Sequence, residues 1–169
     1  MTLADCEAVA TVRVRGWQSA YAGLMPQPHL DAMDITEDAA LRRRYLASRN
    51  DVVNVVAERP GAGVVGWAAL GPYREAGRRL ERGELYAIYV LPEQTGTGVG
   101  RALMTEVLAR ATAAGHPDLA LWVLKENAPA RRFYERAGFR TDGAEEPFDV
   151  DGVAVPEVRY VRALWASDE

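Results

Sequence analysis

The spacing of apolar residues in the first part of the chain predicts helices. Val9, Val12 and Trp17 recur at intervals of three to five residues, near one face of a helix over residues 5–21. Asp5 stands at the start of this pattern and is a suitable N-cap. Two further stretches have helical character, a short turn or helix over 28–33 and a helix over 37–48.

Strand-like spacing follows. The runs 52–58 and 64–70 are rich in β-branched and apolar residues and are predicted to be strands. Residues 59–63 between them contain a proline and two glycines, which favours a hairpin connection. The polar stretch 71–83 is predicted to be a loop, with one helical turn around 75–82.

The second half of the chain alternates strands and helices. The runs 84–91 and 118–124 are predicted strands, and the second is almost wholly apolar, as expected for a strand covered on both faces. Residues 99–114 have the pattern of an amphipathic helix, and Gly115 is its expected C-terminal stop. The remaining predictions are a helix capped by Asn127 and ending at Gly138, and two strands, up to 148 and over 153–164, joined through 149–152.

The composition is that of one globular domain over residues 1–169. The chain is 49% hydrophobic, which is enough for a core, and no repeat, linker or low-complexity tract divides it. Its net charge of −4 argues against a nucleic-acid partner. The single Cys6 excludes an internal disulfide, and His29 and His116 have no metal-ligand spacing, so no metal is expected. In the absence of a signal peptide or a long apolar run, we expect no membrane association and a cytoplasmic location.

A glycine loop, Gly96-Thr97-Gly98-Val99-Gly100, joins the strand 84–91 to the following helix. Glycines let the backbone approach a ligand closely, and the free N–H groups of a helix's first turn bind phosphate oxygens. A P-loop is excluded because Arg101-Ala102 stands where lysine and a hydroxyl residue are needed. A dinucleotide fingerprint fits poorly, because the spacing is Gly-x-Gly-x-Gly and the loop lies mid-chain. Alone, the loop predicts either a phosphorylated ligand or a glycine-rich turn without one.

A second motif indicates which ligand the glycine loop binds. Residues 127–139, Asn-Ala-Pro-Ala-Arg-Arg-Phe-Tyr-Glu-Arg-Ala-Gly-Phe, resemble the C-terminal signature of the GNAT superfamily of acyl-CoA N-acyltransferases. That signature is roughly Asn-x-x-Ala-x-x-Phe-Tyr-x-x-x-Gly-Phe. The preceding strand, glycine loop and helix resemble the pyrophosphate-binding motif of the same family, in the family's order and at its distance. Motif-level resemblance covers residues 84–139. Weaker similarity includes Trp17-x-x-x-Tyr21-x-Gly23-Leu24 and Glu157-Val-Arg-Tyr160.

The resemblance implies a single-domain GNAT-like α/β (α+β) fold. Its central sheet would be mixed and largely antiparallel, with helices on both faces and one splayed strand pair. Two departures from the family pattern stand out. Thr95 occupies the position of the family's usual glutamine or arginine, with Gln94 one place early, and the family's first strand is scarcely visible.

The resemblance also implies a binding site for acetyl-CoA. Backbone N–H groups of residues 97–101 would hold the pyrophosphate, and the pantetheine arm would follow the strand 84–91. Asn127 would cap its helix and contact the cofactor, and Arg131 would meet the adenosine 3′-phosphate or form a solvated pair with Glu135. The full set of expected cofactor-binding residues is Tyr89, Val90, Thr95, Gly96, Thr97, Gly98, Val99, Gly100, Arg101, Asn127 and Arg131.

Two residues have catalytic roles by the same resemblance. Tyr134 would protonate the leaving thiolate, since a phenol of pKa about 10 can donate to a thiolate of pKa about 8.5. Glu84 would be the general base, because a substrate ammonium of pKa about 10.4 must lose a proton before it attacks. The alternative for Tyr134 is an aromatic side chain that only packs in the core. The alternative for Glu84 is a glutamate that only meets solvent, in which case a chain of water molecules would take the proton of the amine. Trp17, Tyr21, Tyr86 and Tyr89 would wall the acceptor pocket or simply pack in the core.

The function implied is transfer of an acetyl group from acetyl-CoA to a primary amine of a small molecule or peptide, by direct attack in a ternary complex. A different class stays open, a sensor or regulatory module that binds acyl-CoA without turnover, and Thr95 is the residue that keeps it open. The segments that would select the acceptor carry no motif. A homodimer also stays open.

Overall fold

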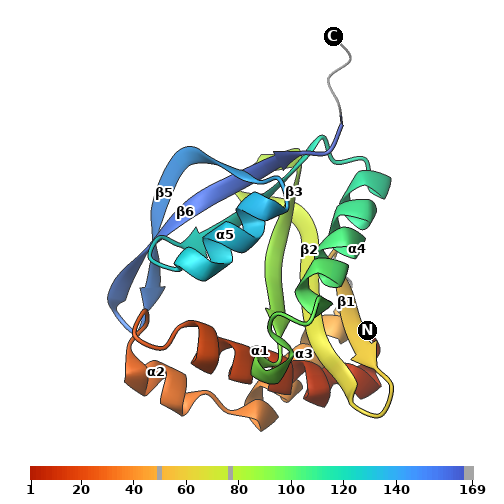
Figure 1. Cartoon of the computed structure of the whole chain (residues 1–169), viewed down its shortest axis with the longest axis vertical. Helices are drawn as coiled ribbons and strands as arrows, with labels where there is room; N and C mark the ends of the chain where they lie inside the picture. The colour runs from red at the N-terminus through yellow and green to blue at the C-terminus, as the bar shows by residue number, and fades with distance from the viewer. Residues whose placement is uncertain (49–50, 76–77, 166–169) are drawn as a thin grey trace.

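The computed structural model describes residues 1–48, 51–75 and 78–165 as one sheet flanked by helices (Figure 1). The helices are α1 (Cys6–Ala20), α2 (Gln27–Ala32), α3 (Ile35–Ala47), α4 (Val99–Ala113) and α5 (Ala128–Arg136), with 3-10 turns η1 (Leu3–Asp5) and η2 (Pro92–Gln94). The strands are β1 (Val53–Arg59), β2 (Gly63–Glu75), β3 (Arg78–Val90), β4 (Asp118–Leu124), β5 (Arg140–Val150) and β6 (Val153–Ala163).

The strand order is β1-β2-β3-β4-β6-β5. Every neighbouring pair is antiparallel except β3 and β4, which are parallel. A parallel pair needs a crossover connection, and η2, the glycine loop and α4 supply it. The expected mixed, largely antiparallel sheet is confirmed.

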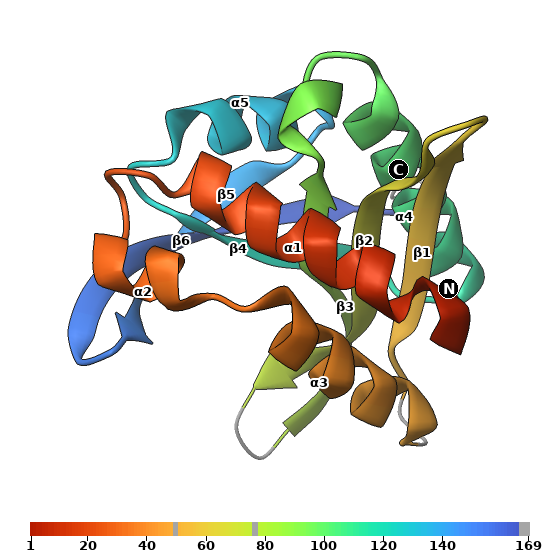
Figure 2. The same cartoon turned by 90° about the horizontal axis from the view of Figure 1, so that it is seen from below.

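The two faces of the sheet bury different helices. Ala68 and Leu70 of β2 face the core beneath α4, whereas Trp67 and Ala69, the alternate residues of the same strand, pack with Val9 and Val12 of α1. Figure 2 shows α1 and α3 on the side opposite α4 and α5. This alternation follows from the two-residue period of a strand, and it confirms helices on both faces.

The predicted loop is wrong over 71–75 and 78–83, which are strand. β2 continues to Glu75 and β3 begins at Arg78, with Gly71 opposite Glu84 and Pro72 opposite Gly83. The predicted helical turn is wrong over 78–82, which is strand, while 76–77 lie outside the described residues. The pairing of β2 with β3 continues through this stretch with a register shift between Pro72 and Arg74, and its residues do not alternate between apolar and polar side chains. Periodicity therefore carried no signal there.

The helix ends that matter for the site follow their predicted chemistry. Gly98 has φ 92° and precedes α4 as its N-cap. Gly115 has φ 82°, and bonds from Gly115 N to Thr112 O and from His116 N to Ala111 O close the helix C-terminus. The Asn127 side chain accepts a hydrogen bond from Ala130 N at 3.2 Å and caps α5.

The capping role predicted for Asp5 is different in detail. Asp5 is the N-cap residue of α1, but its side chain makes no capping hydrogen bond to that helix. Its Oδ2 instead accepts from the backbone N and the Oγ1 of Thr2, the N-cap residue of the preceding turn η1. No strand precedes α1 in the described residues.

Candidate active site

The parallel strands β3 and β4 separate soon after they meet. They pair only through Gly83 with Leu119 and Glu84 with Ala120. Further along, β3 keeps its pairing with β2 up to Val90, and β4 keeps its pairing with β6. The facing edges of residues 85–90 and 121–124 therefore leave a gap, which is the splayed pair that the family resemblance implied.

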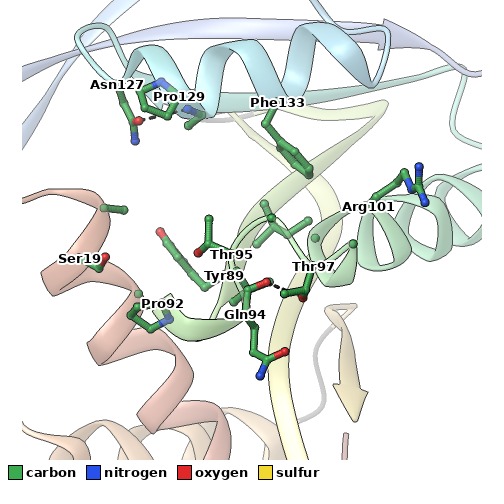
Figure 3. Close-up of a pocket in the computed structure, with 18 of the residues that line it drawn as sticks. Ser19, Tyr89, Pro92, Gln94, Thr95, Thr97, Arg101, Asn127, Pro129 and Phe133 are labelled. Carbon is green, nitrogen blue, oxygen red and sulfur yellow. Dashed lines mark hydrogen bonds between the residues drawn. The ribbon is translucent and has the colours of Figure 1, made fainter. Parts of the chain in front are cut away.

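Two cavities open at this gap. The smaller one, about 110 Å³, lies between β3 and β4 and is lined by uncharged side chains, including Tyr21, Tyr89 and Tyr134. The larger one, about 800 Å³, lies between α1, the end of β3, the glycine loop and the start of α5. Tyr89, Asn127 and Tyr134 line both cavities, so the two are adjacent. Figure 3 shows the larger cavity with Phe133 and Asn127 on one side and the glycine loop on the other.

The glycine loop presents backbone to the larger cavity. Gly96 and Gly98 have φ values of 77° and 92°, a region that favours glycine, and a Cβ at either would meet no atom within 4 Å. The hydroxyl of Thr97 donates to Gln94 O at 2.7 Å, and Arg59 Nη2 donates to Thr97 O at 3.3 Å. The loop is thereby held open toward the cavity, and the first N–H groups of α4 lack partners within the helix.

Most of the predicted cofactor residues come together here. Those that line the larger cavity are Tyr89, Val90, Thr95, Gly96, Thr97, Gly98, Gly100, Arg101 and Asn127. Val99 is an exception because its side chain is buried in the core beside Leu103. Arg131 is the other exception. Its Nε donates to Tyr160 Oη at 3.0 Å and its Nη1 donates to Lys125 O at 2.8 Å. Arg131 therefore connects α5 to β6 and to the end of β4.

The departure at Thr95 has a structural counterpart. Thr95 lines the cavity with a short hydroxyl side chain. Figure 3 shows the Gln94 amide on the opposite side of the loop from Thr95 and Phe133. Its Oε1 is buried without a hydrogen-bond partner among the described residues. Gln94 is among the residues that line the cavity, but its amide is directed away from Thr95 and Phe133, so this amide does not replace the side chain that the family pattern has at position 95.

Tyr134 lies where the two cavities meet. Its ring packs edge-on against Phe133 and Phe139, with ring centroids 5.4 and 6.1 Å apart. Burial raises the pKa of Tyr134 well above its usual value, with a smaller contribution from Tyr89. The phenol therefore stays protonated at neutral pH. No hydrogen bond of this hydroxyl to a described residue is found, so its proton is available to a ligand.

Glu84 occupies a different environment from the one expected. It is 3% exposed and lies at the last pairing of β3 with β4. Its Oε1 accepts from Arg74 Nη2 at 2.8 Å and its Oε2 from Arg74 N at 2.9 Å. It lines neither cavity. Because Arg74 already neutralises the carboxylate, its role as general base stays a prediction without geometric support.

Glu157 is the acidic residue that the sequence did not single out. It pairs with Leu124 of β4 on one side and Glu146 of β5 on the other. Burial, with the negative charges of Glu146 and Glu84, raises the pKa of Glu157 to about 7, although Arg74 opposes the shift. A carboxyl group with this pKa exchanges protons readily at neutral pH. The available signal was its place in the Glu-Val-Arg-Tyr stretch already noted as similar to the family.

The aromatic residues expected around the acceptor pocket divide into two groups. Tyr21, Tyr86 and Tyr89 line the smaller cavity. Trp17 lies behind them, with its ring edge-on to Tyr21 at 5.0 Å, and lines neither cavity. The Tyr86 hydroxyl donates to Pro72 O, so it is directed away from the other phenols toward β2.

Comparison with known proteins identifies this arrangement. A model of the Acetyltransferase (GNAT) family matches residues 15–139. The chain belongs to this family. It is 31% identical over 156 residues to the uncharacterized N-acetyltransferase YuaI of Bacillus subtilis, covering 92% of this chain and 86% of that one.

Solved structures show the same GNAT fold. The PaiA N-acetyltransferase of Thermoplasma acidophilum, in complex with coenzyme A, matches with a TM-score of 0.73 at 20% identity over 96% of this chain and 95% of that one. YncA of Salmonella typhimurium, a putative acetyltransferase with its cofactor acetyl-CoA, matches with a TM-score of 0.72 at 22% identity. That match covers 100% of this chain and 94% of the YncA chain.

Among the described residues, no group of His, Cys, Asp and Glu side chains has the arrangement of a metal site. None of the helices in the described ranges has the length and apolar character needed to cross a membrane.

Proposed function

We propose that this GNAT protein transfers an acetyl group from acetyl-CoA to a primary amine by direct attack in a ternary complex. The observation that carries the proposal is the gap between β3 and β4, which opens onto the glycine loop at one end and has the protonated Tyr134 beside it. Two proteins that share the fold were solved with coenzyme A or acetyl-CoA bound, which supports this choice of donor.

The cofactor would bind mainly through backbone groups. The N–H groups of residues 97–101 suit a pyrophosphate because the N-terminus of a helix attracts negative charge without a metal. The free edge of β3 suits the pantetheine amides, which would pair with it much as a further strand does. The thioester of the bound cofactor would then reach Tyr134, one of the residues that line both cavities.

The reaction needs one base and one acid. We assign the base to Glu157. It lines neither cavity, as is also true of Glu84, but it has no ion pair with a described residue, and its pKa of about 7 makes it a stronger base than an ordinary carboxylate. After the amine loses its proton, its nitrogen attacks the thioester carbonyl carbon, and a backbone N–H of β3 donates to the developing oxyanion. The carbon–sulfur bond then breaks, and Tyr134 gives its proton to the leaving thiolate. The products are an N-acetyl amide and free CoA.

The test is release of CoA thiol from acetyl-CoA against a panel of primary amines. We expect Tyr134→Phe and Glu157→Gln each to lower kcat by roughly 10²-fold, the usual contribution of a positioned acid or base. In the wild type, kcat/KM should rise as the pH increases through about 7, because only the deprotonated Glu157 accepts a proton. Glu157→Gln should remove this rise.

Two comparisons make the assignment falsifiable. Glu58→Gln, at an exposed position on β1, should leave the rate and its pH dependence unchanged. If Glu84→Gln removes the pH dependence and Glu157→Gln retains it, Glu84 is the base. Tight CoA binding without thiol release for any amine would instead identify a binding module of this fold.

A further inference from the structure

Two aromatic side chains line the smaller cavity from the two strands that separate. Tyr86 on β3 and Trp122 on β4 each stand two residues beyond the last pairing of these strands, Glu84 with Ala120. Tyr86 packs against the cluster on the α1 side of the sheet. Trp122 lies between two β4 residues that face the core beneath α4, so it faces the α1 side as well. Both residues line the smaller cavity and not the larger one.

Contacts with β2 hold the Tyr86 ring in place. Its hydroxyl donates to Pro72 O, and Arg74 Cζ lies 4.0 Å from the centroid of the ring, where a cation is attracted by the aromatic face. The Arg74 guanidinium is itself fixed, because its Nη2 lies 2.8 Å from Glu84 Oε1. The Tyr86 ring therefore cannot swing aside without the loss of both contacts.

Contacts with β2, β5 and β6 hold the Trp122 ring in a similar way. Arg159, which pairs with Trp122 between β6 and β4, has its Cζ 5.6 Å from the centroid of the indole. Arg159 Nη1 donates to Tyr73 Oη at 2.8 Å, and its Nη2 lies 2.8 Å from Asp142 Oδ2. The smaller cavity is thus bounded on both strands by an aromatic ring that a paired arginine supports.

Tyr21 forms a third wall of the same cavity. It also lines the smaller cavity and not the larger one. Its hydroxyl oxygen lies 3.0 Å from that of Tyr89, where either group can donate, and Trp17 packs edge-on against its ring at 5.0 Å. The three walls come from α1, β3 and β4, and each is held by contacts of its own.

The volume of the smaller cavity limits what can enter it. It is about 110 Å³, whereas a cavity of about 150 Å³ holds one benzene molecule, so the smaller cavity has room for about four or five non-hydrogen atoms. In the proposed complex, CoA fills the larger cavity and its thioester lies at Tyr134. The amine then has to reach the carbonyl carbon through the smaller cavity, between walls that do not move apart.

We propose that Tyr21, Tyr86 and Trp122 select acceptors whose primary amine stands at the end of an unbranched carbon chain. This inference rests on the acetyl transfer proposed above. A CH2–NH2 end passes between the three rings as a single file of atoms, whereas a branch on the carbon beside nitrogen meets one of them. The class includes alkyl diamines and the side-chain amine of lysine. It excludes the α-amino group of an amino acid that has a side chain, and the uncharged lining also disfavours the carboxylate beside that group.

Three isomeric amines test the selection, because they differ only in branching. Butylamine, sec-butylamine and tert-butylamine have none, one and two branches at the carbon beside nitrogen. In the wild type, each branch should lower kcat/KM for thiol release from acetyl-CoA by at least ~10-fold, the usual effect of a carbon group that a pocket does not fit.

A smaller ring at position 122 should relax the selection. Trp122→Phe should raise kcat/KM for sec-butylamine relative to butylamine by at least ~5-fold, and Trp122→Ala should raise it further. The comparison cancels the intrinsic reactivity of the amines, since wild type and variant react with the same pair. Trp165→Phe makes the same replacement at a 54% exposed position and should keep the wild-type ratio.

Each further outcome contradicts a stated part of the proposal. A wild type that acetylates the three amines within ~2-fold of one another would overturn the selection and leave acetyl transfer intact. The same holds for a Trp122→Phe protein that binds CoA normally and keeps the wild-type ratio. If Trp122→Ala does not fold, as truncation of a large aromatic residue can cause, Trp122→Phe alone decides. A wild type that releases no thiol with any amine overturns the proposed function and the selection together.

Discussion

The two halves of the site are built from different parts of the polypeptide. On the cofactor side, the end of β3, the glycine loop and the starts of α4 and α5 present mainly backbone, and Arg101 is the one charged residue among those that line the larger cavity. On the proposed acceptor side, the smaller cavity is lined by uncharged side chains, and charged side chains stand in pairs on the strands outside that lining, such as Arg74 with Glu84 and Arg159 with Asp142. Under the proposed function, the first half would bind the pyrophosphate through its backbone, and the second half would select the amine through its side chains.

The largest effect should come from placing a charge in the backbone half. Gly98→Asp puts a carboxylate beside the N–H groups that would hold pyrophosphate, so we expect CoA to bind at least ~100-fold more weakly, because like charges repel there. Isothermal titration calorimetry with CoA measures this change.

A matched glycine controls for backbone strain. Gly143 has φ 86°, close to the 92° of Gly98, and a Cβ at either would meet no atom within 4 Å. Gly143→Asp therefore introduces the same residue at a similar left-handed position far from the loop, and it should bind CoA normally. Equal losses in both variants would mean that strain, rather than the phosphate cradle, explains the effect.

In the proposed acceptor half, removal of one partner of an ion pair should lower the stability of the fold. Arg74→Ala leaves the 3% exposed Glu84 without its guanidinium partner, although the Arg74 backbone N–H still donates to it. We expect a loss of about 2 kcal/mol in the free energy of unfolding, typical of a buried charge that loses a hydrogen bond. Urea unfolding measures it.

An exposed ion pair provides the contrast. Arg110 Nε and Glu106 Oε1 lie 2.7 Å apart on α4, and about half of each side chain is exposed. Arg110→Ala should cost no more than about 0.5 kcal/mol, because exposed pairs contribute little. If the two variants lose equal free energy of unfolding, the Arg74–Glu84 pair contributes no more to stability than an exposed ion pair does.

The smallest expected effect restores the family pattern in the cofactor half. Thr95→Gln adds an amide where Thr95 now lines the cavity, and one further hydrogen bond worth about 1 kcal/mol should tighten CoA binding by roughly 5-fold. Thr105→Gln adds the same side chain to an exposed position of α4 and should change nothing. No gain at Thr95 would mean that the backbone alone satisfies the pyrophosphate.

The cofactor half was predictable because its signals are local. A glycine at φ 92°, an asparagine cap and a glycine stop each act within a few residues of where they stand. The placement of Tyr134 followed from the resemblance and the helix that Asn127 begins. Val99 and Arg131 were less predictable, because which side of a helix faces the ligand depends on packing against the sheet.

The acceptor half could not be predicted in the same way because its partners are distant in the sequence. Arg159 reaches Tyr73 across 86 positions, and Tyr21 reaches Tyr89 across 68. The Arg74–Glu84 pair forms only because β2 and β3 continue as strands through a stretch expected to be a loop. Glu157 acquires its raised pKa from burial and from Glu146 and Glu84, residues on two other strands.

The short contact between β3 and β4 also has a mechanical consequence. Because only two residue pairs join these strands, the sheet divides into two three-stranded parts, β1-β2-β3 and β4-β6-β5, which meet beside the Arg74–Glu84 pair. In the proposed complex, a donor that hydrogen bonds along the open edge of β3 would connect the two parts. Its binding is therefore expected to make the sheet more rigid than it is in the free protein.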